Sequence, residues 1–314
     1  MHATQIEQAY ERICSKIVET PLLHSEAVDQ VLGNGHRIYF KCENFQITRS
    51  YKPRGALNAL MKKPKVPAIA RSSGNFAQAL AWAGSQLQIP VTIVMPNDIS
   101  QVKIKGTKKW GARVVICEPS YESQYAAVEK LLQKKPDSQV ISPYDDLDII
   151  EGQGTVALEA LRQAPNITHF FGPIGGGGLM SGCSSYIKEV APMVKVIGVE
   201  PEGASDYYQS RQAGEKISNT ETNTIAEGLR TPCVGDYNWP LLNQNVDEVT
   251  TVSDSAIIEA MKLLFETLGI VVEPSGAVAT AALIECKPPG DSLVVISGGN
   301  IDPEQFINQF SHRL

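Results

Sequence analysis

Short apolar runs alternate with helical segments through most of this chain, and this alternation constrains its fold more than any other feature. Runs at residues 91–95, 112–117, 169–174 and 292–296 are rich in β-branched or aromatic residues and have the length of buried strands. Helical patterns separate them along the chain. Repetition of strand and helix is typical of a parallel, twisted sheet with helices on its faces. The sequence therefore predicts an α/β protein.

Composition limits the kind of protein further. The 314 residues are enough for about two ordinary domains, and a net charge of −6 argues against a nucleic-acid or acidic-membrane partner. No apolar run approaches the ~18 residues that a membrane helix needs, and the N-terminus lacks the pattern of a signal peptide. The six cysteines form no C-x-x-C pair, which argues against zinc and disulfides. We expect a cytoplasmic protein.

Lys52 stands directly before Pro53, and this pair marks a corner between a strand and a helix. Proline fits the first turn of a helix, and the residue before it is kept away from the α region. The Lys52 amine can therefore point into a cleft. It becomes a nucleophile when burial, or a nearby cation such as Arg54, removes its proton. The alternative is an ordinary solvated lysine.

Two further turns between a strand and a helix are suited to anions. Residues 72–75 read Ser-Ser-Gly-Asn and precede a helix whose free N–H groups could accept a carboxylate, although an ordinary helix cap explains them as well. Residues 175–178 are four glycines, whose backbone can approach a phosphate monoester closely. No Lys-Ser/Thr follows, so this is no P-loop, and a tightly packed turn remains the alternative.

Two other patterns carry weaker predictions. Residues 152–157 match G-x-G-x-x-A, but no clear strand precedes them, so we interpret them as the opening of a helix rather than a dinucleotide site. Glu200, Ala204 and Asp206 offer two carboxylates and a carbonyl, which suits a hard cation, with a solvated acidic loop as the alternative.

Six of these stretches, in this order, resemble the serine/threonine dehydratase and serine racemase family, which are fold-type II (tryptophan synthase β-like) pyridoxal-phosphate enzymes. The matching motifs lie at 50–56, 72–75, 152–155, 175–178, 273–277 and 297–300. The resemblance implies two domains, each with a twisted, mostly parallel sheet flanked by helices, and an active site in the cleft between them. Residues 1–52 and 145–314 would form the large domain and residues 53–144 the small one. It also implies a homodimer.

The resemblance assigns a role to each motif. It implies that Lys52 carries pyridoxal 5'-phosphate as a Schiff base, that Ser297 contacts the pyridine nitrogen and that Asn75 contacts the ring hydroxyl. The other implied groups are the phosphate site Gly175, Gly176, Gly177 and Gly178, the substrate-carboxylate site Ser72, Gly74 and Asn75, and an Mg²⁺ or Ca²⁺ site at Glu200, Ala204 and Asp206.

The implied activity is that of an ammonia-lyase, which converts L-threonine, L-serine or a related 3-hydroxy amino acid to a 2-keto acid and ammonia. An amino-acid racemase is the alternative, because racemisation needs an acid or base on each face of the carbanion and Ser73 could serve the face opposite Lys52. Ser73 could instead cap the helix at Phe76. A phospholigand-binding protein without chemistry is the remote alternative, and Lys52 argues against it.

The sequence departs from the family's pattern around the substrate. Arg49 stands where glycine is common, Phe76 replaces the usual histidine, and Gln124 stands where racemase-like chains often carry arginine. These changes leave the prediction of the cofactor intact and the identity of the amino-acid substrate open.

Overall fold

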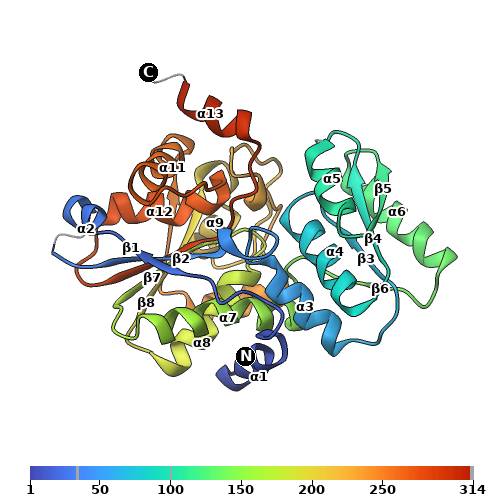
Figure 1. The fold of residues 1–314 in the computed structure, drawn as a ribbon, viewed down its shortest axis with the longest axis horizontal. Coiled ribbons are helices and arrows are strands. Elements are labelled where there is room, and N and C mark those ends of the chain that lie inside the picture. Colours follow the sequence, from blue (N-terminus) through green and yellow to red (C-terminus); the bar gives the residue numbers. More distant parts are fainter. Residues whose placement is uncertain (33–34, 100, 312–314) are drawn as a thin grey trace.

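The computed structural model describes residues 1–32, 35–99 and 101–311 and contains two separate sheets (Figure 1). The first has six strands, and every neighbouring pair is parallel except β1 with β2. Its order is β1 (Leu22–His24), β2 (Ile38–Cys42), β10 (Ser292–Ile296), β7 (His169–Pro173), β8 (Lys195–Pro201) and β9 (Glu248–Val252).

The second sheet has four strands, all parallel. Its order is β5 (Arg113–Cys117), β4 (Val91–Pro96), β3 (Ala68–Arg71) and β6 (Gln139–Val140). The predicted α/β class with parallel-rich sheets is therefore confirmed. The proposed domain boundaries stay a prediction.

Helices cover both faces of the six-stranded sheet, because its central strands are apolar on both sides. On β7, Phe170 and Phe171 point to opposite faces and enter two different hydrophobic clusters. The cluster around Phe170 includes residues of α1 (Ala3–Ile13), α7 (Leu147–Gln163), α8 (Gly178–Val190), α9 (Asp206–Ala213) and α10 (Asn238–Asn245). The cluster around Phe171 includes residues of α2 (Glu26–Leu32), α11 (Asp254–Leu268), α12 (Pro274–Cys286) and α13 (Pro303–Ser311).

The four-stranded sheet is also covered on both faces (Figure 1). Ala68 and Ala70 pack in the cluster that contains residues of α3 (Lys52–Lys62), α4 (Asn75–Leu87) and α5 (Gln101–Lys108). Ile69, between them, faces α6 (Tyr121–Lys134) and packs with Val128. The remaining short 3₁₀ segments are η1 (Glu43–Phe45), η2 (Glu202–Ala204) and η3 (Glu227–Leu229). None of the described helices combines the length and the apolar character that crossing a membrane requires.

The glycines at 152 and 154 do not open a helix, so that prediction was wrong. The helix α7 begins at Leu147, and the Asp146 carboxylate accepts the N–H of Asp148 as its N-cap. A Cβ on Gly152 would stand 2.6 Å from the Cα of Gly55, so this glycine lets α7 and α3 approach closely. Close helix packing, rather than a turn, explains why glycine is tolerated inside this helix.

Candidate active site

A cleft of about 680 Å³ lies at the carboxyl ends of strands from both sheets. Its lining includes Arg71 at the end of β3, Pro96 at the end of β4 and Pro173 at the end of β7. Ligands of open α/β sheets bind at this edge. The structure brings together here six of the predicted site residues: Lys52, Ser72, Ser73, Gly74, Asn75 and Ser297.

Lys52 is the first residue of α3, and Pro53 occupies the first turn as the sequence predicts. Its Nζ donates to the carbonyl oxygen of Pro143 at 3.0 Å and lies 4.9 Å from the ring centre of Tyr51. Desolvation lowers the pKa of Lys52 from 10.5 to about 8. A fraction of this amine is therefore neutral near physiological pH and can act as a base or nucleophile.

Arg54 does not supply the activating charge, which corrects one expectation. Its guanidinium is fully buried and forms ion pairs with Glu43 and Glu159. Burial alone accounts for the lowered pKa of Lys52.

The segment 72–75 leads from β3 into α4, and Gly74 is the N-cap of this helix. Ser73 is therefore not the capping residue, and the Ser72 hydroxyl lies 3.5 Å from the N–H of Gly74. A Cβ on Gly74 would meet nothing within 4 Å, so open space lies in front of the turn. The uncapped N–H groups of α4 can accept a carboxylate from the cleft.

The Asn75 amide is fixed from both ends. Its Nδ2 donates to Glu273 Oε1 at 2.6 Å, and its Oδ1 accepts from Asn300 Nδ2 at 2.7 Å. Burial raises the pKa of Glu273 to about 7. Sequence reasoning placed Glu273 and Asn300 in matching motifs but gave neither a role. Both side chains line the cleft, and Asn300 stands shortly after the predicted strand at 292–296.

Ser297 follows β10 and is 5% exposed. Its hydroxyl donates to the carbonyl oxygen of Ser275 at 3.2 Å, and its own carbonyl accepts the N–H of Tyr51 at 3.1 Å. The second contact ties the end of β10 to the residue before Lys52. A neutral hydroxyl therefore stands in the same cleft as the lysine amine.

The glycine run 175–178 lies directly behind the surface of the cleft. Gly177 has φ +95° and is the N-cap of α8, which has no side-chain cap. A Cβ on Gly175 would stand 3.2 Å from the Cα of Leu229, and one on Gly176 would collide with the ring of Tyr144. Leu229 and Tyr144 line the cleft, whereas the glycines are not part of its lining. Close packing thus accounts for part of the glycine requirement, and the uncapped helix start remains suited to an anion.

Glu200, Ala204 and Asp206 are all buried, so a solvated acidic loop is excluded. Glu200 accepts the N–H groups of Tyr207 and Tyr208 at 3.1 and 2.6 Å, and Asp206 accepts the N–H of Val234 at 2.8 Å. Burial raises the pKa of both acids, that of Asp206 to about 7, and the charge of Asp206 raises that of Glu200 further.

This acidic pair fits a hard cation through carboxylate and carbonyl oxygens. No lysine or arginine forms an ion pair with either acid in the described chain. No group of three or more His, Cys, Asp or Glu side chains gathers to hold a metal ion within residues 1–32, 35–99 and 101–311, so a cation here would also need backbone carbonyls.

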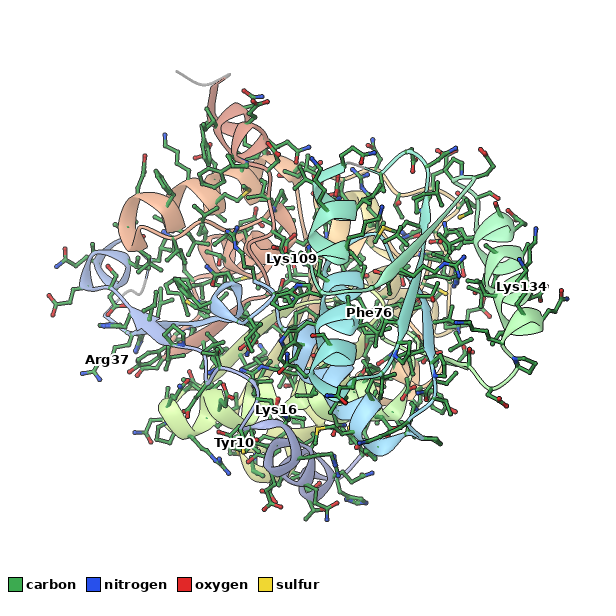
Figure 2. All side chains as sticks on the ribbon, turned by 45° about the vertical axis from the view of Figure 1, so that its right-hand side comes forward. Tyr10, Lys16, Arg37, Phe76, Lys109 and Lys134 are labelled. Carbon is green, nitrogen blue, oxygen red and sulfur yellow. The ribbon has the colours of Figure 1, made fainter. Side chains whose placement is uncertain are left out.

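The departures from the family's pattern lie around the same cleft. Phe76 is 2% exposed, and its ring centre lies 5.9 Å from Lys52 Nζ; Figure 2 shows it near the middle of the molecule, on α4. Arg49 has φ +58°, in the left-handed region that favours glycine. Gln124 lines the cleft from α6, beside Tyr121 and Tyr125.

Residues 13–298 match the family model described as pyridoxal-phosphate dependent enzyme. Serine racemase of Arabidopsis thaliana is 39% identical over 95% of this chain and 92% of the relative. The L-threo-3-hydroxyaspartate ammonia-lyase of Saccharomyces cerevisiae is 36% identical over 96% and 94%.

The solved structure of maize serine racemase superposes with a TM-score of 0.93 at 35% identity, covering 99% of this chain and 97% of the other. The relatives thus include both racemases and ammonia-lyases. This chain belongs to the pyridoxal-phosphate dependent enzymes.

Proposed function

We propose that this enzyme is an ammonia-lyase that converts L-threonine, L-serine or a related 3-hydroxy amino acid to a 2-keto acid and ammonia. The observation that carries the proposal is the buried Lys52 amine, with its pKa lowered to about 8, in one cleft with the neutral Ser297. The ammonia-lyase among the relatives supports it.

When bound, pyridoxal phosphate supplies an electron sink that weakens the Cα–H bond of an amino acid. Lys52 Nζ would hold the cofactor and later take the Cα proton. The N–H groups at 72–75 would orient the substrate carboxylate, and the fixed Asn75 amide would orient the cofactor ring. Ser297 would be a neutral partner for the ring nitrogen, and this would favour loss of a β-hydroxyl over a long-lived carbanion. The glycine run would bind the phosphate.

The absorption spectrum of the purified protein with added pyridoxal phosphate tests this proposal. A band near ~410 nm is expected from the lysine-bound cofactor, together with keto acid from L-serine or L-threonine. Lys52→Ala should lose both signals, whereas Lys65→Ala, which removes an exposed lysine, should keep them. A wild-type protein that stays colourless would contradict any enzyme function and favour a binding protein.

Racemisation is the second candidate activity, and Ser73 supports it. Ser73 lines the cleft and does not cap α4, so its hydroxyl is available for the face opposite Lys52. Ser73→Ala should remove formation of D-amino acid while keto acid from the L-substrate continues. Racemisation at the wild-type rate in this variant would show that Ser73 has no such role.

We also propose that Mg²⁺ or Ca²⁺ binds at Glu200, Ala204 and Asp206. A cation bound only by the folded protein raises its melting temperature by mass action. Chelator should lower the melting temperature and added Mg²⁺ or Ca²⁺ should restore it. Glu200→Gln should remove this response, and an unchanged melting temperature in wild type would contradict the site.

We infer a cytoplasmic homodimer from the family resemblance and the cysteines. All six cysteines are free, which suits a reducing compartment. Analytical ultracentrifugation of the holoprotein tests the dimer, and a single species of monomer mass would contradict it.

A further inference from the structure

Arg71 is the last residue of β3, and the period of the strand decides where its side chain lies. Side chains two residues apart share one face of a strand. Ile69 packs with Val94 and Val128 on the face covered by α6, so Arg71 lies on that face as well. Because the strand ends at the cleft, the Arg71 side chain reaches the wall of the cleft beside α6.

Aromatic rings hold the Arg71 guanidinium in place. Its Cζ lies 3.7 Å from the ring centre of Tyr125 and 5.8 Å from that of Tyr121, both on α6. Stacking of this kind uses the flat face of the guanidinium and leaves the N–H groups on its edge for a planar acceptor. No acid within the described ranges pairs with Arg71.

Besides Lys52, three other basic residues line the cleft, and each already has a polar partner. Lys103 pairs with Glu227, Lys216 pairs with Asp236, and Arg230 donates to the carbonyl oxygen of Thr224 at 2.7 Å through Nε. Arg71 differs from them because its guanidinium contacts aromatic rings rather than an acid or a carbonyl oxygen.

Residues near Arg71 in the chain and on α6 that line the cleft are uncharged. Gln124 and Phe76 are neutral and line the same cleft as Ser73. Arg71 also directly precedes the turn 72–75, where the substrate's α-carboxylate would bind. An amino acid held at that turn would therefore have Arg71 within the same part of the chain as its α-carboxylate.

We propose, on the basis of the lyase function above, that Arg71 binds a second carboxylate on the substrate, so that the preferred substrate class is a 3-hydroxy amino acid with two carboxylates, such as 3-hydroxyaspartate. The flat guanidinium edge matches a carboxylate through two parallel N–H···O bonds. A single cation suits one carboxylate charge better than the double charge of a phosphate ester.

The reaction on this substrate needs no additional reagent. The Cα–H and Cβ–O bonds break, and the hydroxyl leaves as water after it takes up a proton. The unsaturated amine then adds water and releases ammonia, so that 3-hydroxyaspartate yields oxaloacetate and ammonia with no oxidant or reductant.

Steady-state kinetics of the holoenzyme with L-threo-3-hydroxyaspartate and L-serine tests the proposal. Wild type should show a higher kcat/KM for the dicarboxylic substrate. Arg71→Met should lower the ratio of kcat/KM for L-threo-3-hydroxyaspartate to kcat/KM for L-serine by roughly 10- to 100-fold. This is the usual effect of losing a charge-assisted contact. Arg71→Lys should lower this ratio by a smaller factor, because it keeps the positive charge. Arg113→Met is the matched control, because Arg113 is an exposed arginine of the same sheet outside the cleft.

Three results would overturn the proposal. They are an unchanged ratio in Arg71→Met, an equal loss for both substrates accompanied by weaker cofactor binding, and a wild-type preference for O-phospho-L-serine. The second result would mean that Arg71 serves the cofactor.

A binding measurement separates this proposal from the lyase function. Succinate has the same four-carbon dicarboxylate skeleton and cannot react. Calorimetry should show that wild-type holoprotein binds it roughly 10-fold or more tightly than Arg71→Met does. Succinate binding that depends on Arg71 in an enzyme without lyase activity would retain the recognition site and reject the lyase function. Equal binding by both proteins would reject the site itself.

Discussion

Lys52 and Arg54 stand two residues apart on one helix, and their surroundings shift their pKa values in opposite directions. Residues two positions apart in an α-helix are separated by about 200° around its axis. The side chains of Lys52 and Arg54 therefore leave α3 on different sides. Lys52 meets the cleft, where no carboxylate compensates it and burial lowers its pKa to about 8. Arg54 enters the interior and meets carboxylates.

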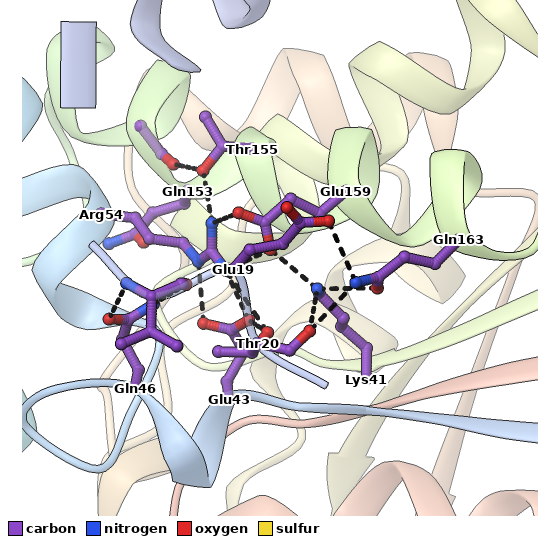
Figure 3. A network of polar contacts seen from close by, with 12 residues as sticks. Glu19, Thr20, Lys41, Glu43, Gln46, Arg54, Gln153, Thr155, Glu159 and Gln163 are labelled. Atoms are coloured by element: carbon purple, nitrogen blue, oxygen red, sulfur yellow. Dashed lines mark hydrogen bonds and ion pairs between the residues drawn. The ribbon is translucent and has the colours of Figure 1, made fainter. Parts of the chain in front are cut away.

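Figure 3 shows the network that receives Arg54. Arg54 Nε and Nη2 bond Glu43 and Glu159 at 2.8 and 2.7 Å, and Lys41 Nζ bonds the same Glu159 at 2.7 Å. All four charged side chains are at most 1% exposed. Burial opposes the charge on Arg54, but the two carboxylates outweigh it and raise the pKa of Arg54.

The difference shows what a partner does to a buried cation. A buried charge that is fully hydrogen-bonded stays ionised and becomes structural, because removing one member leaves its partners uncompensated. A buried lysine without an acid loses its proton readily and becomes chemically useful. The α3 helix therefore connects the structural network to the reactive amine.

The largest expected effect comes from breaking the network. Arg54→Met should lower the free energy of unfolding by about 3–5 kcal/mol, because Glu43 and Glu159 would stay buried without their main partner. Urea unfolding of the cofactor-free protein measures this. Arg113→Met, which removes an exposed arginine, should change it by less than about 0.5 kcal/mol. Equal effects of the two substitutions would show that the buried pairs contribute no net stability.

The next effect has the opposite sign. Lys52→Met should stabilise the cofactor-free protein at pH 7, because the charged amine is disfavoured in the folded state. A pKa lowered from 10.5 to about 8 corresponds to at most about 3–4 kcal/mol of stabilisation.

The pH dependence of this difference follows from proton binding. Between pH 8 and 10.5 the unfolded state binds more protons at Lys52 than the folded state does, so wild-type stability rises with pH in that window. The advantage of Lys52→Met should be complete below pH 8 and gone above about pH 10.5. A difference that stays constant from pH 7 to 10.5 would mean that the amine is not desolvated.

The smallest effect concerns a hydroxyl at the edge of the network. Thr20 Oγ1 donates to Glu43 Oε1 at 2.6 Å, and Thr20→Val should cost about 1.5 kcal/mol because a buried carboxylate loses a donor. Thr280→Val is the matched control, since Thr280 Oγ1 is buried without a hydrogen-bond partner in the described chain. It should be neutral or stabilising in the same unfolding measurement.

The sequence by itself determined the features that are local in the chain. Alternating strands and helices predicted the α/β class, and Pro53 predicted the helix start after Lys52. The motifs at 72–75 and 297–300 each follow a parallel strand, and the carboxyl ends of parallel strands meet at one edge. The succession of strands and helices along the chain, the turn residues and the helix starts depend on neighbours in the sequence, so they can be predicted from it.

Only the tertiary structure decided which charges find partners. Glu159 lies 105 residues from Arg54, Glu273 lies 198 residues from Asn75, and β10 enters the sheet between β2 and β7. Only the tertiary structure shows that Gly152, without a side chain, lets α3 pack closely against α7. The stacking of Arg71 on the rings of α6 is likewise visible only there. A pKa, a close approach of helices and a stacked guanidinium all depend on atoms brought together from distant parts of the chain, and no local pattern of residues encodes those distances.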